Sequence, residues 1–557
     1  MSININELKN ELLFIPLGGT NEIGINVNLY HYLGKWIMVD CGAGFADDTM
    51  PGVDIVVADI SFIIKHKKDL LGLVLTHAHE DHLGAIQYLW EDLECPIYAT
   101  NFTASFLRAK LGEYSISDNI EINSLNPSSK IDLGPFSIEM VPLAHSAPEM
   151  QALLIKTDKG SIFHTGDWKF DSNPLIGKDS DEKQLKEIGD RGVLALISDS
   201  TNVFNKENAG SEGDLQKSLF NIIKDCKNLV VVTTFASNLA RLDSLIRIGE
   251  SLNRKIVLTG RSLHRIVAAA QESGYMKDIA GFIDERDISR YKRSEILIIA
   301  TGCQGEPLAA MNKIANNEHR TLRLSDGDSV IFSSKIIPGN EKKIFALFNK
   351  LVKHKVEVKT ERDHFVHVSG HPGVADVKRM FDYIRPEICI PVHGEPVHIH
   401  EHAKLARAHN IKFTLEIENG SVVRLDRKDP KIIGKVKTGY FGVDGDYLIP
   451  KESSVFSLRK RIGYSGIVCL SIVLDKKHSL MAEPIINTPG LVDEIQDIAF
   501  IVLVKERIKQ LILDLRKTKQ SNMNQESMKQ SLRTLVKKLV KQEFGKEPII
   551  ITNILFV

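Results

Sequence analysis

The residues best suited to chemistry form the run Thr76-His77-Ala78-His79-Glu80-Asp81-His82. His77 and His79 follow the apolar segment LGLVL, and residues two apart on an extended strand point to the same side. Both imidazoles can therefore reach one metal ion. Asp81 and His82 follow at the start of a helical segment, where they can bind a second ion beside the first. The run predicts a hydrolytic centre with two metal ions.

Three more potential ligands come directly after apolar, strand-like segments. His145 follows EMVPLA, Asp167 follows SIFHTG and His393 follows CIPV. The loop after a strand can project a side chain into a cleft, so these residues can complete the centre. We expect one ion on His77, His79 and His145, the other on Asp81, His82 and His393, with Asp167 between them.

The ligand types indicate which metals fit. Imidazole and carboxylate suit two divalent ions, with zinc as the first choice and manganese as the alternative. Asp40, after the segment WIMV, is expected to orient a ligand, because a metal-binding histidine usually needs a carboxylate or carbonyl partner.

Composition narrows the class of protein. The chain has 557 residues, enough for several domains, and its 71 basic residues balance 71 acidic ones. No global field attracts a polyanion, so any nucleic-acid groove must be local. The cysteines form no C-x-x-C pair, which argues against a disulfide framework or a zinc ribbon. Without a signal-like N-terminus or an apolar run of membrane-spanning length, we expect a soluble, cytoplasmic protein with no membrane partner.

The elements that must position these residues change in character along the chain. Up to residue 205, short β-rich runs alternate with turns, and two helical segments, 86–93 and 102–114, are expected to cover the sheets. Strands and helices alternate over 206–362, which predicts a parallel sheet. Histidine-rich strand chemistry returns at 363–425, 426–455 is expected to be a linker, and 456–557 predicts a small α+β domain.

The motifs resemble known families. VLTHAHEDHLGA, His145, HTGD and MVDCG resemble the metallo-β-lactamase superfamily, and the long block before His393 resembles the β-CASP insertion of its nucleic-acid-processing branch. PLGGTNEIG, SDSTN, TTFASNLAR, SSKIIPGNE, HVSGHPG and PVHGE are similar to the bacterial ribonuclease J family. The resemblance implies an α/β protein: an αββα sandwich (1–205 and 363–425), an inserted parallel β-CASP domain (206–362) and the C-terminal domain.

The resemblance also implies a function. It indicates a metal-dependent ribonuclease in RNA maturation and decay, a 5′-to-3′ exonuclease preferring 5′-monophosphate ends and having endonuclease activity. It implies homodimers or homotetramers and partnership with other RNA-decay proteins. Asp199 and His371 match the β-CASP motif acid and histidine, and Asp81 is expected to orient the nucleophile. His371, polarised by Asp199, could protonate the leaving oxygen or hold the phosphate.

Three loops are expected to contact RNA. In HVSGHPG, the amides of Ser369 and Gly370 could form a nest for a terminal phosphate, with a plain turn as the alternative. TTFASN opens a helix, where its polar residues could cap the helix or hold phosphate, and the serines before the Pro-Gly turn could contact phosphate or pack the loop. The expected RNA-binding residues are Thr234, Phe235, Ala236, Ser237, Asn238, Ser333, Ser334, His367, Val368, Ser369, Gly370 and His371.

Two other functions remain open from the sequence. A DNA nuclease of the same group would use the same metal chemistry, and no residue indicates recognition of the RNA 2′-hydroxyl. A non-catalytic RNA-binding subunit of a degradation assembly would be expected to lose metal ligands, whereas all seven positions are filled. A small-molecule hydrolase conflicts with the long insertion.

Overall fold

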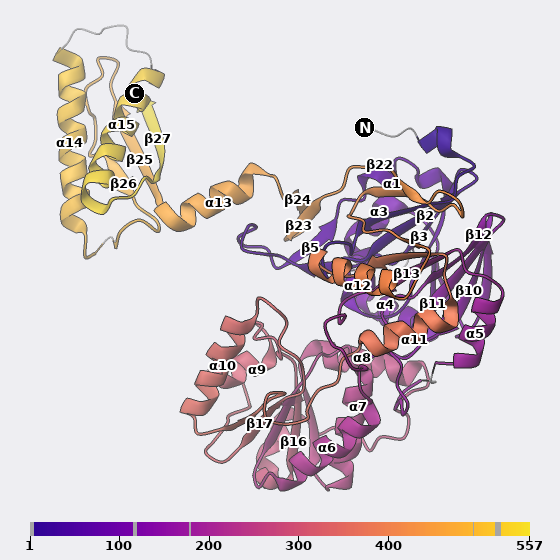
Figure 1. The fold of residues 1–557 in the computed structure, drawn as a ribbon. Helices are drawn as coiled ribbons and strands as arrows, with labels where there is room; N and C mark the ends of the chain where they lie inside the picture. Colours follow the sequence, from indigo (N-terminus) through magenta and orange to yellow (C-terminus); the bar gives the residue numbers. More distant parts are fainter. Residues whose placement is uncertain (1–4, 115–119, 178–179, 494, 518–524) are drawn as a thin grey trace. The chain divides into compact units, whose positions relative to one another are not determined.

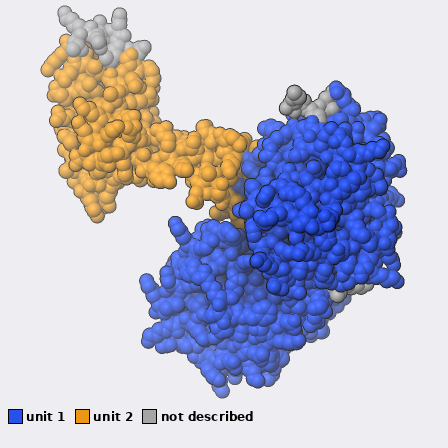
Figure 2. Space-filling view, in the orientation of Figure 1, with its two compact units in different colours: residues 1–44, 56–440 blue, residues 45–55, 441–557 orange. Residues whose placement is uncertain are grey.

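The computed structural model describes residues 5–114, 120–177, 180–493, 495–517 and 525–557. The chain forms two compact units, coloured separately in Figure 2. Unit 1 comprises Met1–Gly44 and Val56–Tyr440, and unit 2 comprises Phe45–Ile55 and Phe441–Val557.

Two sheets form one lobe of unit 1, where Figure 1 labels β2, β3, β10 and β12. The first has the order β22 (Lys431–Lys435), β21 (Ser421–Arg424), β1 (Leu13–Gly18), β2 (Val27–Tyr32), β3 (Lys35–Val39), β6 (Leu70–Val74), β7 (Ile97–Thr100) and β8 (Ile122–Leu125). The second has the order β20 (Phe413–Thr414), β19 (Ile388–Val392), β13 (Ala195–Asp199), β12 (Gly160–His164), β11 (Gln151–Thr157), β10 (Phe136–Pro142) and β9 (Lys130–Leu133).

The two sheets share an apolar core. Phe14 and Tyr30 from the first sheet lie in one buried cluster with Ile138 and Ile197 from the second. Apolar side chains of α5 (Glu182–Asp190), α11 (Val374–Ile384) and α12 (Pro396–Ala408) bury the outer face of the second sheet. The layered α/β sandwich expected from the sequence is therefore present. The predicted helices are α3 (Ile86–Leu93) and α4 (Asn101–Gly112), preceded by the short α1 (Ser61–Ile64) and α2 (Glu80–Leu83).

The inserted segment folds into a parallel sheet, as its alternating pattern predicts. Its strands lie in the order β15 (Lys255–Thr259), β16 (Ile296–Ala300), β14 (Val230–Thr233), β17 (Ser329–Phe332) and β18 (Glu357–Lys359). The helices are α6 (Glu212–Asp225), α7 (Leu239–Ser251), α8 (Arg261–Glu272), α9 (Ala310–Ala315) and α10 (Glu341–Lys353). Because all five strands run parallel, the loops at 233–238 and 333–340 leave the same edge of the sheet.

The range 426–455 differs from the linker expected from its composition. It contains β22 and a hairpin of β23 (Tyr440–Asp444) and β24 (Tyr447–Pro450). β22 pairs antiparallel with β21, so this part of the range belongs to the sandwich. Gly445 and Asp446 form the hairpin turn, because Asp444 pairs with Tyr447 across it, and Gly445 has a φ of 62°, which glycine adopts readily. These turn residues explain why the composition resembles a linker.

Unit 2 contains the small α+β domain. Strand β25 (Ile467–Leu474) lies between β26 (Ile485–Asn487) and β27 (Ile549–Phe556). Helices α14 (Ile498–Lys517) and α15 (Gln525–Phe544) pack their apolar stripes on one face of this sheet, and α13 (Ser454–Ser465) precedes it. The remaining short strands, β4 (Ala43–Phe45) and β5 (Ile55–Ala58), have residues in both units. No helix in the described ranges combines the length and apolar character needed to cross a lipid bilayer.

Candidate metal centre

The expected ligands gather at one edge of the sandwich. His77 and His79 follow β6, Asp167 follows β12, and His393 comes directly after β19. His393 has a φ of 51°, a left-handed conformation unusual outside glycine, and its amide donates to the Gly19 carbonyl at 2.6 Å. This strained turn ends the strand and redirects the histidine, a form of strain that concentrates at functional sites.

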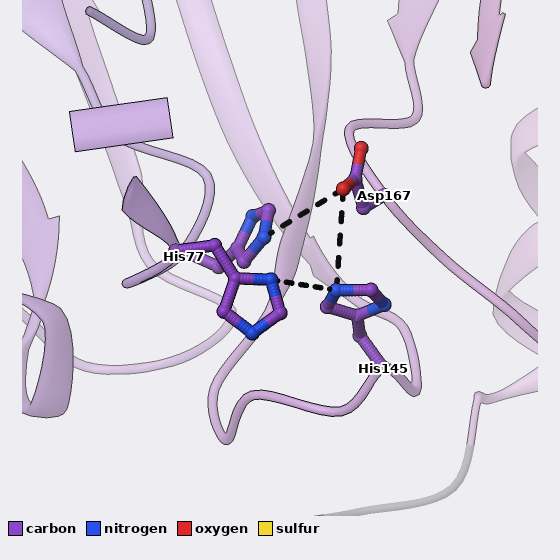
Figure 3. A group of neighbouring side chains, drawn as sticks. His77, His145 and Asp167 are labelled. Carbon is purple, nitrogen blue, oxygen red and sulfur yellow. Dashed lines mark hydrogen bonds and ion pairs between the residues drawn. The ribbon is translucent and has the colours of Figure 1, made fainter. Parts of the chain in front are cut away.

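The first potential metal group consists of His77, His79, His145 and Asp167. One donor atom from each lies within 4.8 Å of the others. His79 Nδ1 lies 3.1 Å from His145 Nε2, and His77 Nε2 lies 3.9 Å from an Asp167 oxygen. Figure 3 shows His77, His145 and Asp167 turned toward one another.

The second group consists of Asp81, His82, Asp167 and His393, so Asp167 belongs to both. Its Oδ2 lies 3.1 Å from His82 Nε2, and its Oδ1 lies 2.9 Å from His393 Nδ1. Asp81 Oδ2 lies 3.3 Å from His393 Nε2. A carboxylate between two clusters of donors has the position needed to bridge two ions.

Buried hydrogen bonds orient the imidazoles. His82 Nδ1 donates to Asp40 Oδ2 at 2.7 Å, which directs Nε2 toward Asp167. The Thr76 hydroxyl donates to the same Asp40 oxygen at 2.9 Å and lies 3.0 Å from His77 Nδ1, so His77 directs Nε2 into the cluster. Asp40 thus lies against His82, where it can orient the ring as expected from the sequence.

Gly370 orients another ring. His145 Nδ1 donates to the Gly370 carbonyl at 2.7 Å, which leaves Nε2 for the cluster. A Cβ on Gly370 would lie 2.9 Å from His145 Cε1, so the close approach requires glycine. The HVSGHPG loop therefore contributes to the metal centre as well as to the expected RNA surface.

A third group joins the β-CASP motif residues to the centre. His371 Nδ1 lies 2.8 Å from Asp199 Oδ2, and both residues form a possible metal group with Asp167 and His393. Asp199 is buried, whereas the His371 side chain remains 24% exposed. His371 is therefore the member of this pair that a substrate can reach.

The donor set fits divalent metal ions. His77 Nε2 is fully buried and has no hydrogen-bond partner among the described atoms, although buried polar atoms are nearly always paired. Imidazole nitrogens and carboxylate oxygens are ligands that zinc prefers. An orphaned nitrogen facing three other donors fits a metal ion better than a purely structural cluster.

Electrostatics divides the histidines into two kinds. Burial, together with neighbouring imidazoles, lowers the pKa of His77 and His145 well below normal, and burial lowers that of His79 to about 4. These rings are neutral at pH 7, the form that binds metal. Burial opposes charge on His82 and His393 as well, but nearby carboxylates, Asp167 foremost, raise both pKa values well above normal.

Most of the expected RNA-binding side chains at the β-CASP sheet edge have partners within the protein. Asn238 caps α7 by accepting from the Arg241 amide at 2.9 Å. The buried Ser333 hydroxyl donates to the Val366 carbonyl and accepts from Arg241, and Thr234 donates to the Ser333 carbonyl. Ser334 and Val368 are buried as well, while Phe235, Ala236, Ser237, His367, Ser369, Gly370 and His371 remain partly exposed.

The contacts of three residues were not anticipated from the sequence. Thr76 links Asp40 to His77, as described above, and Thr201 Oγ1 lies 3.2 Å from His393 Nδ1. Asn26 Nδ2 lies 3.1 Å from His82 Nε2. Thr76 and Thr201 stand beside recognised motif residues, which is a usable signal, whereas nothing in the local sequence marks Asn26.

Comparisons with protein families define the class. Residues 35–182 match the beta-lactamase superfamily domain, and residues 355–415 match the Zn-dependent metallo-hydrolase RNA specificity domain. With the sandwich and its donor clusters, these matches define a metal-dependent hydrolase of the metallo-β-lactamase superfamily with RNA as its substrate class. Residues 227–351 match the ribonuclease J beta-CASP domain, and 454–557 match the ribonuclease J C-terminal domain. The chain belongs to the ribonuclease J family.

Whole-chain relatives support this assignment. Ribonuclease J of Sinorhizobium meliloti is 36% identical over 97% of this chain and 96% of its own length. Ribonuclease J2 of Bacillus subtilis is 32% identical over 98% of each chain. A solved protein of unknown function from Enterococcus faecalis shares the fold, with a TM-score of 0.52 and 18% identity over 75% of this chain and all of its own.

Proposed function

We propose that this protein degrades RNA from its 5′ end, preferring a 5′-monophosphate, and that it also cleaves internally. The observation that carries the proposal is the position of Asp167 between two donor groups, directly beside the His371–Asp199 pair. The names of the relatives support RNA as the substrate. The 5′-to-3′ direction and the preference for a 5′-monophosphate are part of our proposal.

The seven expected ligands would hold two divalent ions, zinc first and manganese as the alternative. When bound, these ions activate water for attack on phosphorus and offset charge on the phosphoryl oxygens. We assign orientation of the attacking water to Asp81, whose side chain is 31% exposed. The ligands proposed for the two ions are His77, His79, Asp81, His82, His145, Asp167 and His393.

We assign proton transfer to His371. Burial opposes its charge, but Asp199 and Asp167 raise its pKa above the usual value, which favours the protonated ring. Asp199 binds Nδ1, which leaves Nε2 to donate to the leaving 3′-oxygen of ribose. The released RNA then carries a 5′-phosphate and is itself a substrate.

The end preference rests on the loop at 367–371. Burial, followed by the nearby cations Arg241, Lys335 and Lys169, lowers the pKa of His367 well below normal. Arg241 and Lys169 are paired with Glu212 and Asp171, so the exposed Lys335 is the cation of this group that we propose meets an anion. Ser369 lies two residues after His367 and bonds with the His371 backbone, so the loop is already shaped by its own hydrogen bonds. We propose that it receives the terminal phosphate.

End-labelled RNA tests the proposal, with metal content measured on the same preparation. We expect 5′-monophosphorylated RNA to be degraded progressively from the 5′ end, triphosphorylated RNA to resist, and matched single-stranded DNA to remain intact. Equal degradation rates for 5′-monophosphorylated and 5′-triphosphorylated RNA would contradict the proposed phosphate site. Equal cleavage of DNA and RNA would favour a DNA nuclease. Absence of both bound metal and cleavage would favour a non-catalytic RNA-binding subunit. Light scattering would test the accompanying proposal of a homodimer or homotetramer.

A further inference from the structure

An exposed aromatic ring lies on the loop that carries Asp199. Phe204 follows Asp199 by five residues and leaves 55% of its surface exposed. The backbone around it is firmly attached: Asn205 donates to the Asn202 carbonyl and accepts from the Val374 amide. The loop is therefore held in place while the ring of Phe204 stays outside the apolar core.

The same loop is attached to the metal centre at three points. Asp199 binds His371, and Thr201 Oγ1 donates to the His393 carbonyl at 3.0 Å. Asn202 Nδ2 donates to the His371 carbonyl at 3.3 Å. The position of Phe204 is thus tied to that of the reacting centre.

A second ring comes from the loop and helix after His393. His398, in the first turn of α12, meets Phe204 edge-on, with ring centroids 5.1 Å apart at 66°. One turn later His402 Nδ1 lies 3.0 Å from Ser200 Oγ, so this face of α12 turns toward the Asp199 loop. Val397 beside His398 is 51% exposed.

Gly394 allows the two loops to approach each other. A Cβ at this position would lie 2.8 Å from His398 Cβ and 3.2 Å from Ser200 Cβ. The aromatic pair therefore lies against the segments that deliver Asp199 and His393. Single exposed apolar residues are ordinary, but a ring paired with a second ring on two site-bearing loops is a specific arrangement.

We propose that Phe204, supported by His398, is a stacking platform for one nucleobase of the RNA strand bound at the metal centre. A phenyl face accepts any base, so the platform would add affinity without sequence preference. Its edge-on partner His398 would fix the ring orientation. The inference rests on the proposed ribonuclease function and assigns a base-binding subsite within it.

Single-stranded RNA binding tests the platform. The probe is a fluorescent, 5′-monophosphorylated RNA hexamer, used with the Asp81→Ala variant to prevent cleavage. Adding Phe204→Ala should weaken binding about tenfold, within the range for one stacked base, while Phe204→Trp should retain it. The control is Phe556→Ala, because Phe556 is 43% exposed and also pairs with a histidine, His478 at 5.5 Å, but lies in the C-terminal sheet.

Abasic RNAs identify the stacked base. We expect one of the single-abasic hexamers to bind the Asp81→Ala parent about tenfold more weakly than the intact hexamer does. For that hexamer, and for no other, adding Phe204→Ala should cause no further loss of binding. If Phe204→Ala binds every RNA within about twofold of the parent, or Phe556→Ala matches its loss, the platform is wrong. End-labelled RNA cleavage by the unmodified protein tests the proposed ribonuclease function separately. If Phe204→Ala has no effect but the unmodified protein cleaves RNA, only the platform is wrong. If the unmodified protein neither cleaves nor binds RNA, both the platform and the proposed function are wrong.

Discussion

The metal centre and the edge of the β-CASP sheet use polar side chains in opposite ways. At the centre, hydrogen bonds hold the outer ring nitrogens of His82 and His145, while the buried His77 Nε2 has no hydrogen-bond partner in the described structure. At the sheet edge, Ser333 and Arg241 satisfy each other and the surrounding carbonyls. The first region presents donor atoms to a ligand, whereas the second uses them internally.

This difference shows that chemically similar motifs can have different consequences. A buried donor atom without a hydrogen-bond partner lowers the stability of the fold unless a ligand binds it. The centre is therefore preorganised to bind a ligand. Polar groups that complete each other stabilise the loop that carries them. We therefore expect substitutions at the centre to remove chemistry and substitutions at the sheet edge to remove stability.

Removing a ligand should have the largest effect. His79→Ala or Asp81→Ala takes one donor from a group that needs it for metal binding and for the reaction, so RNA hydrolysis should fall by about 10³-fold or more. Initial rates on labelled RNA and metal content measure the loss, and circular dichroism checks the fold. His400→Ala is the control, since His400 is exposed and pairs with Glu416. Full activity in either ligand variant contradicts the two-metal arrangement.

Breaking the buried ion pair of the β-CASP domain should cost stability. Arg241 and Glu212 are both buried and bind through two hydrogen bonds, at 3.1 and 2.9 Å. Arg241→Met leaves the Glu212 charge without its partner, so the free energy of unfolding should fall by about 3–5 kcal/mol. Urea denaturation measures it.

Arg247→Met on the same helix is the control for this pair. Arg247 is partly exposed and pairs with Asp243 and Asp278, so its loss should cost less than about 1 kcal/mol. Equal losses in the two variants would show that burial does not distinguish these pairs.

The structure brings the potential metal ligands together as the sequence predicts, whereas their roles and the RNA contacts remain predictions. His77 to His82 form one local run whose geometry follows from strand and helix periodicity, and turns after apolar strands marked His145, Asp167 and His393. Asn26 was not predicted because its contact with the centre is to His82, which lies 56 positions away in the sequence. No local pattern records such a contact.

At the sheet edge, the sequence left two roles open for the same residues. A serine or asparagine before a helix can cap it or bind phosphate, and both need the same spacing. The structure shows Asn238 capping α7, whereas contact with RNA remains a proposal. Local spacing does not reveal buried partners such as Arg241, which donates a hydrogen bond to the Ser333 hydroxyl. The strands in the range 426–455 were not predicted, because turn residues dominate its composition. The strand that β22 pairs with, β21, lies outside this range.

Asp40→Asn should have a smaller effect on the centre than loss of a ligand. The Asp40 carboxylate accepts from His82 and from both the amide and the hydroxyl of Thr76, so the change disturbs ring orientation without removing a donor. We expect metal affinity to fall about 10- to 100-fold, measured by competition with a chromogenic chelator. Asp69→Asn is the control, because Asp69 forms an exposed pair with Lys35. Unchanged affinity in Asp40→Asn would mean that other contacts orient His82.

Ser333→Ala should have the smallest effect and divides the two regions most sharply. The hydroxyl bonds with Arg241 and the Val366 carbonyl, but Arg241 also donates to the Ser333 carbonyl, so part of the network survives. Unfolding free energy should fall by about 1 kcal/mol, measured by urea denaturation, while the KM for RNA stays unchanged. Ser237→Ala is the comparison, because Ser237 is only half-buried in the neighbouring loop. A raised KM with unchanged stability in Ser333→Ala would show that this hydroxyl binds RNA after all.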